Sequence, residues 1–104
     1  MKYKYHIYQL DKDNENVRKY RKMFVSWDFL EKYCGGFNIR EYNKIYDGEI
    51  ESAFKRDEVV LDILFRQFNL NHPIDFHGHS LSVSDVVVLN GTMYYCDSLC
   101  WKKI

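Results

Sequence analysis

The sequence has little proline or glycine, no long apolar run and no excess charge of either sign. One Pro and five Gly among 104 residues exclude collagen-like, proline-rich and disordered classes of protein. No apolar run approaches the ~20 residues that span a bilayer, and residues 1–5 lack the apolar core of a signal peptide. Fifteen Lys and Arg balance 15 Asp and Glu, whereas domains that hold a polyanion carry a basic excess. We therefore expect one cytoplasmic domain without a membrane segment.

Cysteine is also scarce. Cys34, Cys96 and Cys100 are an odd number without the spacing of a disulfide framework, so we expect free thiols in a reducing cytoplasm. Apolar side chains are abundant by contrast, at 46%, and 17% of the residues are aromatic, mostly Tyr and Phe. A chain of this length can bury about two-thirds of its unfolded surface in one core.

Two segments have the apolar spacing of helices. Residues 57–69 place their apolar side chains in one broad stripe, and Asp57 is a candidate N-cap for this main helix. Residues 26–34 form a shorter predicted helix, which the Ser26 hydroxyl can cap. The pattern of residues 17–25 fits either a helix or a short extended segment.

Turn signals divide the predicted strands. Asp47-Gly48 and Asn90-Gly91 each lie between β-forming residues, and such dipeptides are strong short-range indications of a hairpin. The second hairpin is apolar on both faces, which places it inside a sheet or beneath a helix. The predicted strands are 3–10, 42–46, 49–54, 85–89, 92–96 and 101–104. We expect an α+β fold over residues 1–104, in which an antiparallel sheet is covered by the main helix, 57–69, and the shorter helix, 26–34.

A dense polar segment precedes the second hairpin. Residues 69–89, NLNHPIDFHGHSLSVSDVVVL, resemble the signature of the YodL-like domain family, FN…HP-x-DF-x-GHSLSVSDVVVL. In that family a Gly turn and a paired-Tyr strand follow, here Gly91 and Tyr94-Tyr95. Residues 8–10 and 43–48 fit the same family more loosely.

The resemblance implies a limited set of properties. Domains of this family occur alone or inside larger bacterial proteins associated with mobile elements and conjugative transfer, and they have no established biochemical role. The SLSVSDVVVL-x-G portion is also similar to the strand-turn-strand core of small PUA/ASCH-like barrels, several of which bind RNA. Neither likeness implies a catalytic residue or a cofactor.

The residues of the polar segment are typical of a structural loop that carries an interaction motif. Ser and Asp side chains tie down turns by bonding to main-chain N–H groups. We expect Asp85 to cap the turn of residues 82–84, with His79 as a buried donor, and Gly78 to adopt a main-chain angle closed to other residues. The candidate binding residues are Asp75, His77, Gly78, His79, Ser80, Ser82 and Asp85.

Two chemical alternatives involve the same segment. His77 and His79 could join Cys96 and Cys100 as zinc ligands, although a C-x3-C spacing is looser than the usual C-x2-C. His79, Ser80 and Asp85 have the residue types of a hydrolytic triad. Adjacent His and Ser seldom reach the geometry of a triad, and the sequence has no Gly-x-Ser-x-Gly elbow. We therefore expect no metal, no cofactor and no enzymatic activity.

The leading hypothesis is a non-enzymatic module that binds an unknown protein partner through the surface around residues 77–84. The second hypothesis is binding of RNA or single-stranded DNA, because nine tyrosines could stack on bases. Tyrosines in a small sheet more often bury the ring and leave the hydroxyl in water. The candidate nucleic-acid contacts are Arg18, Lys19, Arg21 and Lys22.

Overall fold

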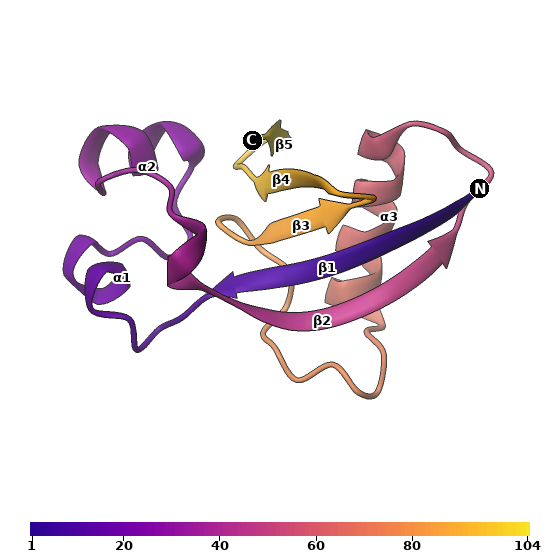
Figure 1. Ribbon diagram of the computed structural model, residues 1–104, viewed down its shortest axis with the longest axis horizontal. Coiled ribbons are helices and arrows are strands. Elements are labelled where there is room, and N and C mark those ends of the chain that lie inside the picture. The colour runs from indigo at the N-terminus through magenta and orange to yellow at the C-terminus, as the bar shows by residue number, and fades with distance from the viewer.

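The computed structural model describes residues 1–104 as one five-stranded antiparallel sheet with helices on both faces (Figure 1). The strand order is β2-β1-β3-β4-β5, so β1 lies between β2 and β3. The strands are β1 (Lys2–Leu10), β2 (Tyr42–Glu51), β3 (Val86–Leu89), β4 (Thr92–Cys96) and β5 (Trp101–Lys103). The helices are α1 (Glu15–Tyr20), α2 (Trp27–Tyr33), the 3-10 helix η1 (Ile39–Glu41) and α3 (Asp57–Leu70).

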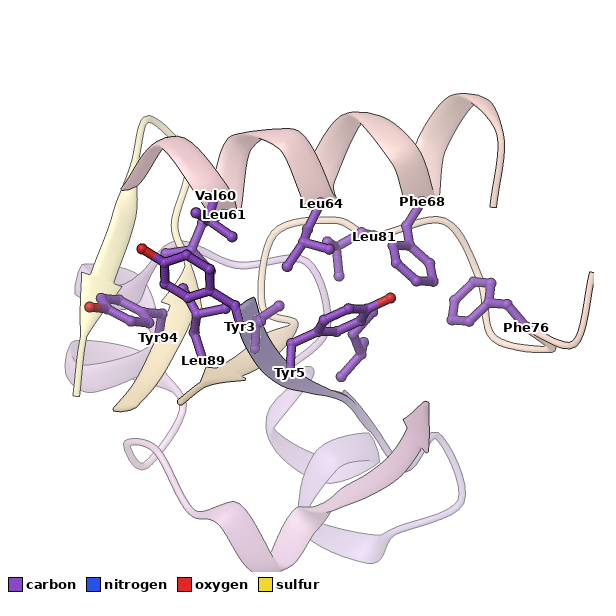
Figure 2. Close-up of a cluster of buried hydrophobic side chains, with 12 residues drawn as sticks. Tyr3, Tyr5, Val60, Leu61, Leu64, Phe68, Phe76, Leu81, Leu89 and Tyr94 are labelled. Atoms are coloured by element: carbon purple, nitrogen blue, oxygen red, sulfur yellow. The ribbon is translucent and has the colours of Figure 1, made fainter. Parts of the chain in front are cut away.

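The main core lies between α3 and one face of the sheet (Figure 2). The apolar stripe that the sequence predicts for this helix is buried against β1, because alternate β1 side chains point toward it. Two residues of the segment before β3 close the end of this core. The buried residues are Tyr3, Tyr5, Ile7, Val60, Leu61, Leu64, Phe68, Phe76, Leu81, Val87, Leu89 and Tyr94.

A second, smaller core lies on the opposite face of the sheet. It is covered by the segment that holds α1, α2 and η1, which lies beside one end of the sheet in Figure 1. Ser26 caps α2 as predicted, and its Oγ accepts a hydrogen bond from the Phe29 N–H at 3.2 Å. The buried residues of this core are Leu10, Val17, Leu30, Cys34, Tyr42, Val86 and Tyr95.

The predicted hairpin of residues 85–96 is confirmed. Leu89 pairs with Thr92 and Val87 with Tyr94, which is the register that a two-residue Asn90-Gly91 turn imposes. Asn90 and Gly91 both have positive φ, at 47° and 85°, as a type I′ turn requires. The hairpin lies inside the sheet, because β3 pairs with β1 on one side and β4 pairs with β5 on the other.

The predicted hairpin at Asp47-Gly48 is wrong. Both residues lie inside β2, where Asp47 pairs with His6 and Gly48 with Tyr5. The φ of Gly48 is not positive, so the residue supplies no turn angle. Gly48 instead supplies space, because a Cβ at this position would lie 2.5 Å from the Cζ of Tyr5, whose ring is buried.

We therefore expect Gly48→Ala to destabilise the protein by about 1–3 kcal/mol, the usual cost of overpacking. The Tyr5 ring has little room to move, because it packs edge-on against Phe68 with ring centroids 6.0 Å apart. Urea denaturation of this variant measures the loss. Gly91→Ala would meet no atom within 4 Å, so any cost there comes from its positive φ. An unchanged midpoint for Gly48→Ala would contradict this account of the glycine.

Three smaller expectations are corrected or resolved. Asp57 does not cap α3: Arg56 occupies the N-cap position without a side-chain bond, and the Asp57 carboxylate accepts a hydrogen bond from the Tyr94 hydroxyl. The ambiguous segment 17–25 begins in α1, which Asn14 caps, and ends as turns. The sheet has two edge strands, β2 and β5, and does not close into the barrel that the PUA/ASCH likeness implied.

Candidate functional site

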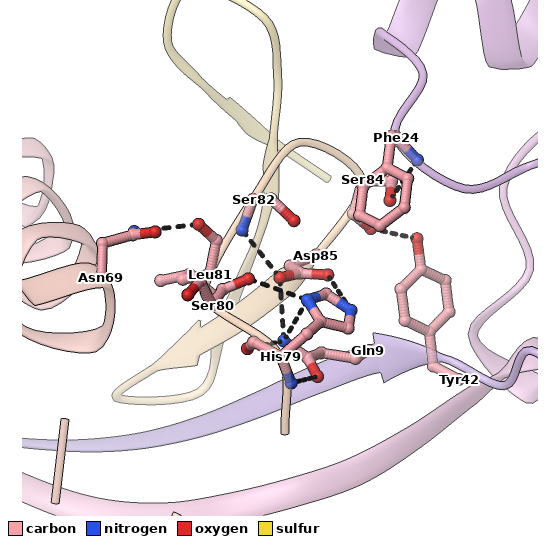
Figure 3. A network of polar contacts seen from close by, with 10 residues as sticks. All are labelled: Gln9, Phe24, Tyr42, Asn69, His79, Ser80, Leu81, Ser82, Ser84 and Asp85. Carbon is pink, nitrogen blue, oxygen red and sulfur yellow. Dashed lines mark hydrogen bonds and ion pairs between the residues drawn. The ribbon is translucent and has the colours of Figure 1, made fainter. Parts of the chain in front are cut away.

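The polar segment before β3 is organised around the buried carboxylate of Asp85 (Figure 3). Its side chain is 1% exposed, and Oδ2 accepts hydrogen bonds from the Ser82 N–H at 2.9 Å and from Gln9 Nε2 at 3.0 Å. The Asp85 N–H returns a bond to the Ser82 carbonyl at 3.0 Å. Asp85 thus caps the turn of residues 82–84, as the sequence predicts.

Gln9 of β1 connects this turn to the sheet, and sequence analysis missed it. Its Nε2 donates to the His79 carbonyl at 2.8 Å, and its Oε1 accepts from the His79 N–H at 3.2 Å. One amide therefore holds both main-chain groups of a residue 70 positions away. The signal was available, because Gln9 continues the inward alternation of Tyr3, Tyr5 and Ile7.

The side chain of His79 lies at the surface, so its predicted role as a buried donor is wrong. The side chain is 37% exposed, and its Nε2 lies 3.8 Å from Asp85 Oδ1. Its Nδ1 lies 2.8 Å from the Ser80 carbonyl oxygen, which can only accept a hydrogen bond. We therefore assign the proton to Nδ1. Gln9, not His79, is the buried donor to Asp85.

Phe24 is the second residue of the site that sequence analysis missed. Its ring is 57% exposed and packs edge-on against the His79 ring, with centroids 5.6 Å apart. Its φ is +64°, a left-handed conformation that costs a residue with a side chain about 1 kcal/mol or more. The Phe24 N–H donates to Oγ of the buried Ser84 at 3.0 Å, and this bond holds the residue in place. We call Phe24 and His79 the aromatic pair.

Ser84 joins the aromatic pair to the second core. Its φ is +83°, its N–H donates to the Cys96 carbonyl at 2.9 Å and its carbonyl accepts from the Tyr42 hydroxyl at 2.6 Å. The polar residues that the sequence places before β3 are thus bonded into strands β1, β2 and β4. The aromatic pair stands on this rigid support.

A polar groove of about 360 Å³ opens beside His79. The predicted role of Gly78 is wrong in its mechanism, because its φ is not positive. A Cβ there would collide with the Ile45 side chain and lie 2.6 Å from Gln9 Oε1, so Gly78 allows close approach. The groove is lined by Gln9, Leu10, Asp11, Lys12, Asp13, Asn43, Ile45, Gly78 and His79.

Burial dominates the electrostatics of the site. Desolvation raises the pKa of Asp85 to about 8, although the hydrogen bonds from Ser82 and Gln9 act in the opposite direction. Desolvation also raises the pKa of the Tyr42 and Tyr95 hydroxyls and the pKa of the Cys96 thiol, the last to about 12. Burial thus favours the uncharged form of Asp85 and of the three neighbouring groups.

The remaining residues of the predicted motif lie at the margin of the site. Asp75 is exposed and accepts a hydrogen bond from the Tyr46 hydroxyl at 3.1 Å, and His77 and Ser80 are also exposed. Ser82 contributes its main-chain N–H, while its Oγ is buried without a partner. The structure thus brings Gly78, His79, Ser82 and Asp85 together and leaves Asp75 and His77 outside.

The two chemical alternatives lack their geometry. No hydrogen bond joins the Ser80 hydroxyl to His79, whose Nδ1 faces the Ser80 carbonyl instead. No group of three or more His, Cys, Asp or Glu side chains converges as a metal site would need. The three cysteines are free, and Cys96 is buried whereas Cys100 is exposed.

Of the four basic residues predicted to contact nucleic acid, which we call the basic cluster, one is buried. Lys22 is buried, and its Nζ lies 2.7 Å from Glu41 Oε1 and donates to the Gly36 carbonyl at 3.1 Å. Lys22 therefore cannot contact a phosphate. Arg18, Lys19 and Arg21 are exposed on and just after α1.

The expectation that tyrosine hydroxyls lie in water is wrong for Tyr3 and Tyr95 of the two cores. The Tyr95 hydroxyl donates to the Val25 carbonyl at 2.6 Å, and the Tyr3 hydroxyl donates to the Phe54 carbonyl at 3.2 Å. These bonds tie irregular segments to the sheet. Because the rings of Tyr3 and Tyr95 are buried, they cannot stack on nucleic-acid bases.

Comparison with known proteins supports a family assignment. No helix has the length and apolar character needed to cross a membrane. Comparisons with curated proteins and with solved structures gave no match. The model of the YodL-like domain matches residues 4–104. This range includes the turn of residues 82–84, the aromatic pair and the whole sheet except the first two residues of β1. The chain belongs to the YodL-like domain family.

Proposed function

We propose that this domain is a non-enzymatic module that binds a protein partner through the aromatic pair and the adjoining groove. The observation that carries the proposal is Phe24. A large aromatic side chain is held exposed in an unfavourable conformation by a partly buried hydrogen bond. Strained residues that do not help the fold cluster at functional sites, and exposed aromatic side chains are common anchors of interfaces.

The surroundings of the pair favour binding over catalysis. Its support is buried and held by hydrogen bonds to Asp85, so the surface is preorganised and ordering it on binding costs little. The exposed part offers an aromatic face, an imidazole and a polar groove, but no activated nucleophile. We further propose that the domain is cytoplasmic, in keeping with its free cysteines, and acts as an accessory module of a mobile-element-associated protein.

Nucleic-acid binding has less support. The basic cluster keeps Arg18, Lys19 and Arg21 but loses Lys22 to its ion pair with Glu41. The total charge of the chain is zero. Binding that weakens steeply with added salt and depends on the three exposed cations would favour this second hypothesis.

Phe24→Asn separates binding from folding. Asn tolerates the left-handed conformation and keeps the N–H that bonds to Ser84, so we expect the free energy of unfolding to stay constant or rise by up to about 1 kcal/mol. We expect binding to fall by about tenfold or more, which is the loss typical of an interface anchor.

The measurement is capture of bacterial lysate proteins on the immobilised domain, followed by quantitative mass spectrometry. Tyr33→Ala is the matched control, because Tyr33 is an aromatic residue of α2 that is 69% exposed. A partner should be retained by the wild type and by the control and depleted by Phe24→Asn. Equal capture by all three proteins, or no specific partner, would contradict the proposal.

A further inference from the structure

Asp85 is a buried acidic residue with no cation bonded to it, which binding of a partner does not require. Three residues with charged side chains are buried in the protein: Lys22, Glu41 and Asp85. Lys22 and Glu41 form an ion pair at 2.7 Å and neutralise each other. Asp85 has no such cation bonded to it. Its Oδ2 is occupied by two N–H donors, while Oδ1 faces His79 Nε2 at 3.8 Å.

The contacts of Gln9 and of His79 Nδ1 determine how we assign the protons around these two atoms. Gln9 Nε2 lies within hydrogen-bond distance of the His79 carbonyl at 2.8 Å, of Asp85 Oδ2 at 3.0 Å and of His79 Nδ1 at 3.1 Å. It has only two hydrogens, and the two shorter contacts to oxygen take them, so Nδ1 is left to donate its own proton. The His79 Nδ1 proton is donated to the Ser80 carbonyl at 2.8 Å, so Nε2 presents a lone pair toward Asp85. A lone pair and a buried carboxylate oxygen repel each other. The approach is favourable only while one proton resides between them.

The other titratable groups around Asp85 do not gain or lose a proton in place of Asp85. Tyr42 of β2 and Tyr95 and Cys96 of β4 all have a raised pKa, which keeps them neutral at mildly alkaline pH. From the other side, the groove brings Asp11, Lys12 and Asp13 near His79, where they are open to solvent. Burial raises the pKa of Asp85 itself to about 8.

We propose that Asp85 and His79 form a proton-dependent switch that holds the aromatic pair together while the proton is present and releases His79 when it is lost. This inference rests on the proposed function, since it adds regulation to the same surface. Loss of the proton leaves a buried anion against the Nε2 lone pair. His79 relieves the repulsion by turning into the open groove, and its ring then leaves the edge of Phe24.

The test follows the free protein by NMR between pH 6 and 10, with no partner present. In the wild type, the carboxyl carbon of Asp85 should titrate with a midpoint near pH 8. The ring resonances of Phe24 should shift with the same midpoint. In Asp85→Asn, which keeps the shape and stays neutral, the Phe24 resonances should not move in this interval.

His79→Phe is a second control, because it keeps an aromatic ring and removes the lone pair. Asp85 should still titrate in this variant while Phe24 remains fixed. The proposal is overturned if Phe24 does not respond in the wild type, if it responds equally in Asp85→Asn, or if Asp85 does not titrate. None of these outcomes depends on a partner, so failure of the lysate experiment would leave this result interpretable.

Discussion

Asp85→Ala should lower the free energy of unfolding by about 3 kcal/mol, whereas Asp85→Asn should change it by less than about 1 kcal/mol. Alanine leaves the Ser82 N–H and a Gln9 N–H buried without an acceptor, and each unsatisfied group costs about 1–3 kcal/mol. Asparagine can accept both bonds with Oδ1 and donate to His79 through Nδ2. Chemical denaturation at about pH 4, where the carboxyl is protonated in the folded state and about half protonated in the unfolded state, measures both values with little contribution from titration. An equal loss in the two variants would contradict the network.

The same carboxyl makes stability depend on pH. Its pKa is about 8 in the folded protein and about 3.9 in an unfolded chain. Between these values the folded state binds more protons, so the stability that Asp85 contributes is complete below about pH 4 and is lost as the pH rises to about 8. The difference in unfolding free energy between wild type and Asp85→Asn should therefore turn against the wild type over this window, by at most about 1.4 kcal/mol per pH unit. A flat difference would show that the carboxyl titrates alike in both states.

Lys22→Ala should be the most damaging change on the α1–α2 side of the protein, at about 3–5 kcal/mol. Lys22 and Glu41 have side chains that are each only 5% exposed, so removal of one leaves the other as an uncompensated buried charge. Lys19→Ala is the matched control, because Lys19 is an exposed neighbour whose loss should cost within about 0.5 kcal/mol.

A double variant, Lys22→Met with Glu41→Leu, distinguishes the buried charge from lost packing. It should recover most of the stability, because an apolar pair of similar volume often replaces a buried ion pair at no cost. Urea denaturation of the four proteins measures the series. A loss below about 1 kcal/mol for Lys22→Ala would indicate that the lysine can move to solvent, and would return it to the candidate nucleic-acid contacts.

The parts of the fold that the sequence predicts are those governed by neighbouring residues. Helix α3, the Asn90-Gly91 hairpin and the cap that Asp85 provides for residues 82–84 each depend on contacts within a few positions. The Asp47-Gly48 prediction failed because the same dipeptide can serve a turn or a close approach, and only the partner strand decides which.

The parts of the site that the sequence does not predict depend on distant contacts. Gln9 meets His79 across 70 positions, and Phe24 meets Ser84 across 60. In the sequence Lys22 is indistinguishable from its basic neighbours, and only the folded structure shows that it is buried against Glu41. Residue type alone does not reveal such pairings, although a polar residue on the inward side of a strand, such as Gln9, is a usable warning.

The position of β1 also governs when the site can form during folding. Tyr5 pairs with Gly48 of β2 on one side and with Leu89 of β3 on the other. The pairing of β1 is therefore complete only after β3, in the last fifth of the chain, has been synthesised. Pairings between such distant segments form slowly, because a long loop must close before any contact is gained. A ribosome-bound chain that ends before β3 therefore contains the residues of the aromatic pair but lacks the bonds from Cys96 that hold Ser84 and Asp85. We expect a partner to recognise the surface only after β3 and β4 have been synthesised and paired.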